Sequence, residues 1–189
     1  MIATSYMTKN CGLMPLSRSA YWIYQDSLFT AGVFTSVKYD TLRFIQTYQS
    51  LPDSIIWWRA NIEIGLPTLM YANDSALFLA EYRMFTQDPI IDAKQEYSLF
   101  EGDSIKYYTS FEDIGAIGRS VKLDAVVKTA AGNFSDCILF EKKSPRYRTD
   151  QVFFKPGLGV VRYVTEQATM GSPEMKLAKI STLMSFRVD

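Results

Sequence analysis

Short stretches of alternating apolar and polar residues, separated by turn-forming residues, recur along the chain. Residues 21–24 and 33–39 are rich in aromatic and β-branched residues and flank residues 30–32, which end in glycine, and this pattern predicts a β-hairpin. Residues 41–48 and 55–64 predict two more strands, because both are rich in aromatic and β-branched residues. The first third of the chain is therefore expected to consist of strands joined by short turns.

The middle of the chain continues this pattern with one longer interruption. Residues 69–71 and 76–84 are predicted to pair as strands across a short polar turn, although 76–84 would also fit a short helix. Residues 87–95 are polar and contain a proline, which favours a long loop or a short helix. A further strand is expected at residues 105–110.

Strands joined by glycine-containing turns are expected in the second half of the chain. Residues 119–128 mostly alternate, which predicts one half-exposed strand. We expect a positive φ at Gly132 or Asn133 and at Gly157, which follows Pro156 as the third residue of a type II turn. The remaining strands are predicted at residues 134–141, 152–154, 160–164 and 177–188.

Together these predictions give about ten mostly antiparallel strands in hairpin order, with at most one or two short helices. The fold class is therefore all-β. A sheet with so many strands tends to curl, split or close, so we expect a curved open sheet, a partial barrel or a sandwich. Residues 15–189 are expected to form this single domain, and residues 1–14 an N-terminal extension.

Composition agrees with a packed β domain and excludes several functions. Aromatic residues make up 14% of the 189 residues and apolar residues 48%. Twenty Lys and Arg balance twenty Asp and Glu, whereas nucleic-acid-binding domains carry a basic excess. The chain has no histidine, which excludes Ser-His and Cys-His nucleophile pairs and most zinc sites. We therefore expect neither a metal nor a cofactor, and no apolar run is long enough to span a membrane.

The two cysteines and the first residues each leave two alternatives open. Cys11 and Cys137 form either one disulfide that closes a long loop or two free thiols. The first residues lack the basic and apolar regions of a secretory signal, so the chain is either cytoplasmic or exported with a signal before residue 1.

Aspartate is followed by a hydroxyl residue and then an apolar residue at five places, with the pairs Asp26-Ser27, Asp40-Thr41, Asp53-Ser54, Asp74-Ser75 and Asp103-Ser104. Turn chemistry explains this pattern, since Asp and Ser side chains bond nearby backbone groups and precede strands. The tripeptide also resembles the acceptor motif of a general O-glycosylation system that modifies envelope proteins of certain Gram-negative bacteria.

Two aromatic pairs provide candidate ligand-binding residues: Trp57 and Trp58, and Tyr107 and Tyr108. Neighbours in a strand point to opposite faces, so one Trp is expected in the core and the other outward or in a groove. An exposed Trp ring can stack on a sugar or an aliphatic chain, whereas a half-buried one simply packs.

Other charged residues suggest chemistry less specifically. Two converging carboxylates could support hydrolysis without histidine, and the candidates are Glu63, Glu81, Glu96, Glu101, Glu112 and Asp113. Residues 142–148 contain four basic residues, which indicate either a solubilising hairpin loop or a contact with phosphate or anionic lipid.

Two turn sequences resemble those of uncharacterised cell-envelope proteins and lipoproteins of Gram-negative bacteria. They are an Ala-Gly-x-Phe turn at residues 131–134 and a Pro-Gly-x-Gly-Val hairpin at residues 156–160. Residues 21–27 resemble the opening strand of such proteins, although Ser19-Ala20-Tyr21 precedes the Trp where Gly-Asn is usual. Some of these proteins are similar to lipoprotein carriers, so the resemblance implies a curved antiparallel sheet and an envelope location.

We therefore expect a non-catalytic cell-envelope protein, periplasmic or associated with the outer membrane. It is expected to bind an apolar group, such as a lipid or another amphiphile, or an envelope protein partner on a concave aromatic face. The alternatives are a glycan-binding module that uses an exposed Trp and, third, a carboxylate-dependent hydrolase.

The fold class can be tested before any atomic detail is known. We expect the far-UV circular dichroism spectrum of the purified protein to be dominated by β-structure, with contributions from the many aromatic residues. A helix content above about one third of the residues, which is typical of mixed domains, would contradict the all-β prediction.

Overall fold

The computed structural model describes residues 12–49, 54–65, 68–72, 76–80, 95–98, 105–107, 116–169 and 173–188. The regular structure within these ranges consists of strands, which confirms the all-β fold class. In these parts of the chain, no helix is long and apolar enough to cross a membrane.

The described residues form fourteen strands, which are β1 (Tyr21–Thr30), β2 (Val33–Gln49), β3 (Ile56–Ala60), β4 (Leu69–Ala72), β5 (Ala76–Ala80), β6 (Gln95–Ser98), β7 (Ile105–Tyr107), β8 (Ala116–Lys122), β9 (Val127–Thr129), β10 (Gly132–Phe134), β11 (Ile138–Ser144), β12 (Arg148–Lys155), β13 (Gly159–Ala168) and β14 (Met175–Arg187). Twelve of them form one sheet in the order β6-β5-β4-β3-β2-β1-β14-β13-β12-β11-β8-β7, and β9 and β10 form a two-stranded sheet. All pairs of neighbouring strands are antiparallel.

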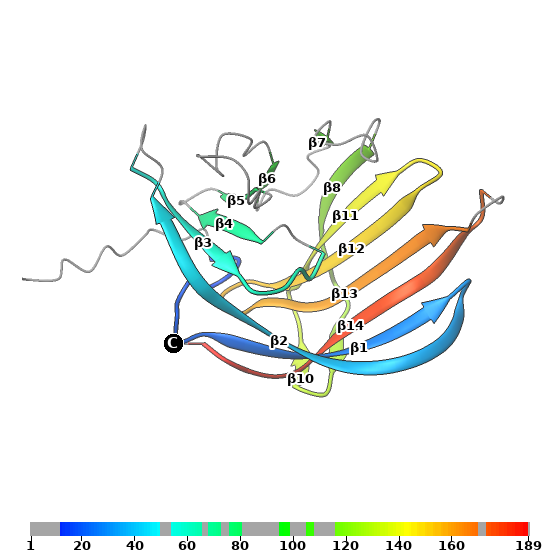
Figure 1. The fold of residues 1–189 in the computed structure, drawn as a ribbon, viewed down its shortest axis with the longest axis horizontal. Helices are drawn as coiled ribbons and strands as arrows, with labels where there is room; N and C mark the ends of the chain where they lie inside the picture. The colour runs from blue at the N-terminus through cyan, green and yellow to red at the C-terminus, as the bar shows by residue number, and fades with distance from the viewer. Residues whose placement is uncertain are drawn as a thin grey trace, which may run out of the picture.

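The large sheet is strongly curved, and the main core lies on its concave side (Figure 1). The end of the sheet formed by β3, β4 and β5 turns back toward the other strands. Met70 of β4 and Leu79 of β5 therefore belong to the same core cluster as Phe140 of β11 and Phe154 of β12. This curled sheet is the open or partly closed form that the sequence predicts.

Residues before β1 also belong to the packed domain. Leu13 and Met14, which the sequence assigns to the N-terminal extension, are fully buried in the main core. The carbonyl of Gly12 accepts a hydrogen bond from the backbone N–H of Gly157. The core therefore begins before the predicted domain boundary at residue 15.

The first two strands form the predicted hairpin. Its turn residues Ala31 and Gly32 both have positive φ, 50° and 83°, as tight hairpin turns require. The prediction of separate strands at 33–39 and 41–48 is wrong, because β2 continues without a break over 17 residues. Asp40 does not end the first strand, since its carboxylate binds Lys38 instead of a nearby backbone group.

Three other predicted strands are shorter or divided in the structure. β3 ends at Ala60, before the predicted end at residue 64. Residues 119–128 are not one strand, because β8 ends at Lys122 and exposed residues form a bend before β9. Residues 134–141 are interrupted at Asp136, whose φ of 53° cannot continue a strand. Residue alternation continues through such breaks, so it does not show where the pairing ends.

The other predicted pairings agree with the structure where it describes them. β4 pairs with β5, and β12 pairs with β13 across the predicted turn. Gly132 and Gly157 have positive φ, 146° and 81°. The predictions for residues 81–94 and 108–110 lie outside the described residues.

The turn at Pro156-Gly157 has the expected geometry of a type II turn. The N–H of Leu158 donates to the carbonyl of Lys155 at 3.0 Å, which closes the four-residue turn. A Cβ atom added at Gly157 would have open space around it. Substitutions at this position therefore test the backbone conformation alone.

We predict that Gly157→Val lowers the free energy of unfolding by more than ~1 kcal/mol, because a β-branched residue is strained at positive φ. The matched variant Gly157→Asn is expected to lose less, since asparagine tolerates the left-handed region. Equilibrium urea unfolding measures both variants. Equal losses for Val and Asn would show that the strain argument is wrong.

Candidate functional site

Strand β1 brings apolar and charged side chains to the same face of the sheet. Trp22, Tyr24 and Asp26 all point to the concave side, because side chains alternate along a strand, and all three are buried. Trp22 and Tyr24 belong to the main core, whereas Asp26 lies one step beyond it. The concave face therefore changes from apolar to charged along the direction of β1.

The charged half of the concave face consists of two clusters. The Asp26 cluster comprises Asp26, Lys38, Asp40 and Lys179, and the Arg148 cluster comprises Arg148, Asp150 and Tyr163.

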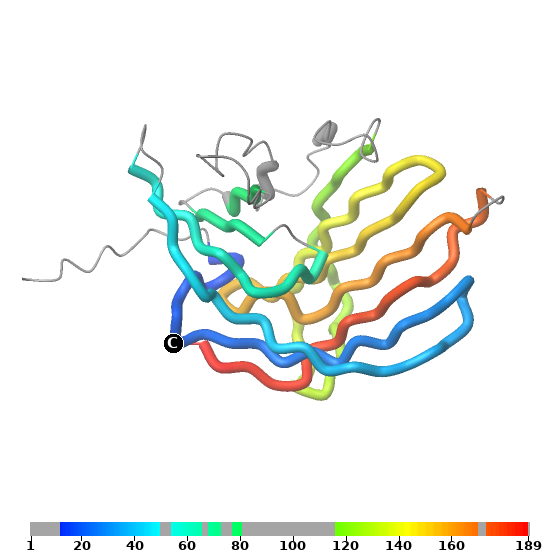
Figure 2. The backbone as a smooth tube through the Cα atoms, viewed as in Figure 1, coloured from blue at the N-terminus to red at the C-terminus, as the bar shows by residue number. Residues whose placement is uncertain are grey.

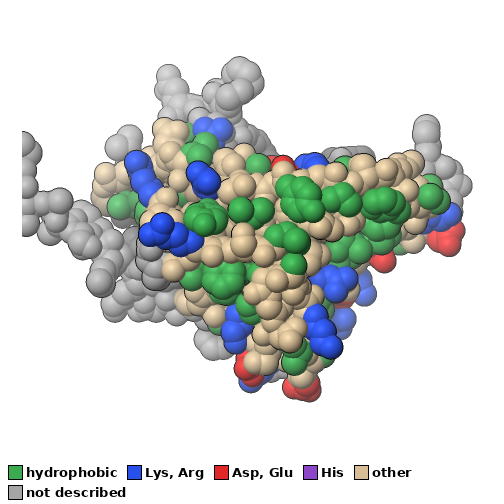
Figure 3. Space-filling model, turned by 90° about the horizontal axis from the view of Figure 1, so that it is seen from below, with side chains coloured by type: hydrophobic (Ala, Val, Ile, Leu, Met, Phe, Trp, Pro, Cys, Tyr) green, Lys and Arg blue, Asp and Glu red, His purple; other side chains and the backbone are tan. Residues whose placement is uncertain are grey.

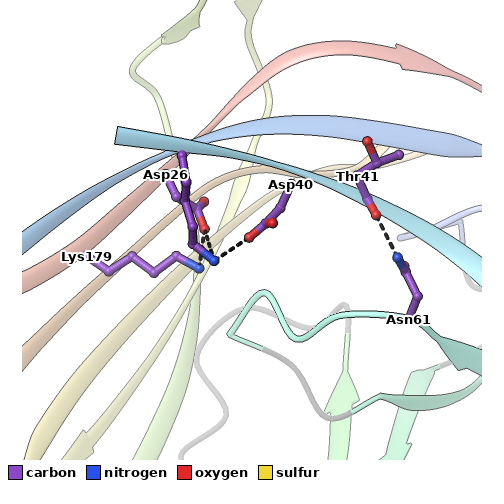
Figure 4. Close-up of polar contacts among 6 residues, drawn as sticks. Asp26, Asp40, Thr41, Asn61 and Lys179 are labelled. Carbon is purple, nitrogen blue, oxygen red and sulfur yellow. Dashed lines mark hydrogen bonds and ion pairs between the residues drawn. The ribbon is translucent and has the colours of Figure 1, made fainter. Parts of the chain in front are cut away.

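In the Asp26 cluster, one buried carboxylate holds two lysines. Oδ2 of Asp26, which is only 1% exposed, lies 2.6 Å from Nζ of Lys179 and 3.7 Å from Nζ of Lys38 (Figure 4). The same Lys38 ammonium donates a hydrogen bond of 2.6 Å to Oδ2 of Asp40. A buried carboxylate is unfavourable unless it is paired, so the two ammonium groups account for the burial of Asp26.

Mutual attraction stabilises the charged forms of Lys38 and Asp40. The hydrogen bond from Lys38 to Asp40 is the main cause that raises the pKa of Lys38. The same bond lowers the pKa of Asp40. At neutral pH Lys38 is thus a cation that is 50% exposed and held by two carboxylates.

The Arg148 cluster repeats this arrangement on β12 and β13. Nε of Arg148 donates to Oδ1 of Asp150 at 2.8 Å, and its Nη2 donates to the hydroxyl of Tyr163 at 2.7 Å. The Tyr163 hydroxyl donates in turn to Oδ1 of Asp150 at 2.6 Å. Burial and the negative charge of Asp150 raise the pKa of Tyr163, so the phenol stays protonated. Burial opposes the charge on Arg148, but Asp150 and Tyr163 outweigh it and raise the pKa of Arg148.

Cross-strand neighbours connect the two clusters over the concave face. Lys179 of β14 lies opposite Thr165 of β13, and Thr165 lies opposite Asp150 of β12. Asp150 lies opposite Lys142 of β11. The charged half is therefore a continuous polar surface across four strands.

Ser181 adds a polar group at the centre of this surface. It lies opposite Asp26, on β14, and is fully buried. Its hydroxyl oxygen has no hydrogen-bond partner among the described residues. Buried polar groups are usually satisfied, so this hydroxyl is an exception within the packed interior.

In each cluster the most buried charged side chain is acidic, which suggests a chemical role for the more exposed basic groups. Asp26 and Asp150 are buried, whereas Lys38 and Arg148 are 50% and 42% exposed. Lys179 is 22% exposed. The carboxylates thus lie underneath and fix the cations, which remain accessible. Such fixed cations suit an anionic group, because little conformational freedom is lost when it binds.

The two tryptophans of β3 lie on opposite faces, as predicted, but both are largely covered. Trp58 is half-buried and packs edge-to-face against Phe44, at the main core. Trp57 is buried in a second cluster on the other face, where its ring lies 5.7 Å from that of Tyr71. The indole N–H groups of both have no hydrogen-bond partner among the described residues. Trp22 is fully buried, so no Trp presents an exposed ring.

The other aromatic candidates and the candidate carboxylates lie mostly beyond the described side chains. Tyr107 lies in β7 but its side chain is not described, and Tyr108 lies outside the described residues. Of the six carboxylates, only the side chain of Glu63 is described, and it is exposed. The structure therefore does not bring these predicted site residues together.

The predicted basic stretch at residues 142–148 is divided between two faces. Lys143 lies 3.2 Å from the carboxylate of Glu141, which Arg119 also binds at 2.9 Å. Arg148, by contrast, belongs to the charged half of the concave face. The stretch is thus not one continuous patch, because neighbouring strand residues point to opposite sides.

Two of the aspartate-hydroxyl pairs do not have the predicted turn role. Asp26 and Asp40 lie inside β1 and β2, where their carboxylates bind lysines instead of initiating a strand. Turn chemistry is therefore the wrong explanation for these two pairs. The sequence could have indicated the position of Asp26, because Trp22, Tyr24 and Asp26 occupy alternate positions of one strand and therefore share a face.

The cysteine alternatives are settled in part. Cys137 is a buried free thiol, and its Sγ lies 3.5 Å from the carbonyl of Phe134. Burial raises the pKa of this thiol, so it behaves as a packed apolar group. Cys11 lies outside the described residues.

Comparison with known proteins gives only distant likenesses. The chain matches no protein-family model and no curated protein. A solved structure of a Bacteroides fragilis protein, assigned as exported and with a YmcC-like fold, matches at a TM-score of 0.45 and 15% identity, covering 93% of this chain and 99% of that one. A protein from Parabacteroides distasonis, assigned as a lipoprotein, matches at a TM-score of 0.41 and 14% identity, covering 95% and 99%. Both scores lie below 0.5, so the likenesses carry no argument about function.

The Arg148 cluster yields a stability prediction. We expect Tyr163→Phe to lower the free energy of unfolding by about 1–3 kcal/mol, because it removes the hydroxyl that joins Arg148 and Asp150 in a buried position. The control is Tyr39→Phe, which removes an exposed hydroxyl bonded to Gln25 at 3.2 Å and should change little. Chemical denaturation of both variants checks this, and equal effects would contradict the role given to the cluster.

Proposed function

We propose that this chain is a non-catalytic binding protein of the cell envelope whose concave face holds an anionic amphiphile. The observation that carries the proposal is the charged half of that face, in which buried carboxylates fix accessible cations. Asp26 fixes Lys38 and Lys179, and Asp150 fixes Arg148. The anionic head of the ligand would bind among these cations, with Lys38 and Lys179 lying at the same carboxylate.

The neighbouring apolar half supports an amphiphile as the ligand instead of a small ion. Along β1, Tyr24 belongs to the main core, and Asp26 is the next residue on the same face. The side chains of this core are packed against one another, so an acyl chain that extends from the cations would lie along the border between the two halves. Trp58 of β3, a predicted ligand-binding residue, is half-buried and packs against this core. We retain it as a candidate contact for the apolar part of the ligand.

An envelope location is supported by the two turn sequences that resemble those of envelope proteins. Ala130 and Ala131 join β9 to β10, which begins at Gly132, and Pro156 and Gly157 lie in the turn that joins β12 to β13. Both segments are turns, as the resemblance implies. The glycan-binding alternative depends on an exposed Trp, and all three tryptophans are buried or half-buried.

The charged half can be tested with two detergents that share one alkyl chain. Dodecyl phosphate carries an anionic head and dodecyl maltoside a neutral one. We expect the purified protein to bind one molecule of dodecyl phosphate by native mass spectrometry, and to bind it more tightly than dodecyl maltoside by calorimetry. Lys38→Gln is expected to weaken dodecyl phosphate binding about tenfold, through the loss of a charge-assisted contact.

Lys143→Gln is the matched control for this experiment. Lys143 is also a half-exposed lysine beside a carboxylate, but its partner is Glu141 outside the charged half. It should leave binding unchanged, and thermal melts should show that both variants fold. Equal affinity for the two detergents, or equal weakening by the two substitutions, would overturn the proposal.

A further inference from the structure

Strand β2 has a neighbour on both sides along only part of its length. It pairs with β1 from Val33 to Arg43, and β3 pairs with its other side only from Phe44 to Gln49. No other described strand pairs with the first half of β2, which lies at the open border of the sheet (Figure 1 and Figure 2). We call residues 33–41 the β2 edge.

Asn61 shows which backbone groups of β2 point away from β1. Its side chain donates to the carbonyl of Thr41 at 2.8 Å, as Figure 4 shows. It also accepts a hydrogen bond from the N–H of Arg43 at 2.7 Å. The backbone groups of alternate strand residues point to the same side. The N–H and C=O groups of Val37 and Tyr39 therefore also point outward, where no described strand meets them.

The β2 edge also carries bare apolar side chains. Val33, Phe34, Val37 and Tyr39 are 44% to 69% exposed. Figure 3 shows apolar side chains uncovered over the convex face of the molecule. Soluble proteins usually protect such an edge with charges, proline or bulges. Here a bulge at Thr35 and the paired charges of Lys38 and Asp40 give partial protection, but the apolar side chains between and beside them stay uncovered.

We propose that a second copy of this chain adds its own β2 edge to this one, antiparallel, around a two-fold axis at Val37. In this register the N–H of Val37 donates to the carbonyl of the second copy's Val37, and the reverse bond forms equally. Tyr39 lies opposite Thr35, and Lys38 lies opposite Ser36. A two-fold interface joins a surface to itself, as this edge allows.

Charge favours a second copy over a charged partner segment. The β2 edge has one cation and one anion, Lys38 and Asp40, and these are joined at 2.6 Å, so the edge has no net charge. In the proposed register no like charges lie directly opposite one another, which would be unfavourable. The edge thus has no excess of either charge that would favour an acidic or a basic peptide, while its apolar side chains and outward-pointing backbone groups match those of its copy.

Oligomeric state tests this proposal directly. We expect the wild-type protein to sediment as a dimer that dissociates on dilution. Val37→Lys should make it monomeric, because it places two like charges next to the axis. Ile117→Lys is the matched control: Ile117 is an equally exposed apolar strand residue, but its strand β8 is paired on both sides, and it should leave the dimer intact.

A cysteine cross-link tests the register independently. In a protein with Cys11→Ser and Cys137→Ser, Val37→Cys should form an intermolecular disulfide under mild oxidation, because hydrogen-bonded partners in antiparallel strands have Cα atoms about 5.5 Å apart. Val126→Cys, which is exposed outside the β2 edge, should not. A wild-type monomer at every concentration, a dimer that survives Val37→Lys, or equal cross-linking of both cysteines would overturn the proposal.

Discussion

Two hydrogen bonds that reach across the concave face help to hold the sheet in its curled form. Nε1 of Trp22 donates to the carbonyl of Leu158, and the hydroxyl of Tyr24 donates to the carbonyl of Val160, both at 2.7 Å. These carbonyls belong to the start of β13 and the turn before it, where the pairing with β14 has not yet begun, since that pairing starts at Arg162. Side-chain donors from β1 thus replace a strand neighbour. Without them, buried carbonyls would be unsatisfied, which is unfavourable, so the sheet is held in its curled form.

This constraint also explains how charges come to be buried nearby. Once Trp22 and Tyr24 face the core, the pleat places Asp26 on the same side. The carboxylate can remain there only because Lys38 and Lys179 come from the two strands that flank β1. Packing of the apolar half and pairing of the charged half are therefore coupled through one strand.

The sequence predicts the parts of this structure that depend on local chemistry. The β1–β2 hairpin and the turn at Gly157 follow from residues that tolerate positive φ. The length of β2 does not follow, because Asp40 resembles a turn residue until its partner Lys38 is placed beside it. The Asp26 cluster is even more difficult to predict from the sequence, because Lys179 is distant along the chain and reaches Asp26 only through the pairing of β1 with β14. The exposure of Trp57 and Trp58 is also not predictable from local sequence, because it depends on which distant segments cover each face of the sheet.

The contact of Asn61 with β2 has one more consequence. Its side chain occupies the backbone groups of Thr41 and Arg43, and its own N–H occupies the carbonyl of Arg43. A single side chain therefore blocks the ladder at that point, and β3 takes over just beyond it. A strand that pairs with the open side of β2 from the hairpin turn onward can therefore pair only as far as this asparagine. Asn61 thus sets the maximum length of an added strand, which can pair only with the stretch between Val33 and Thr41.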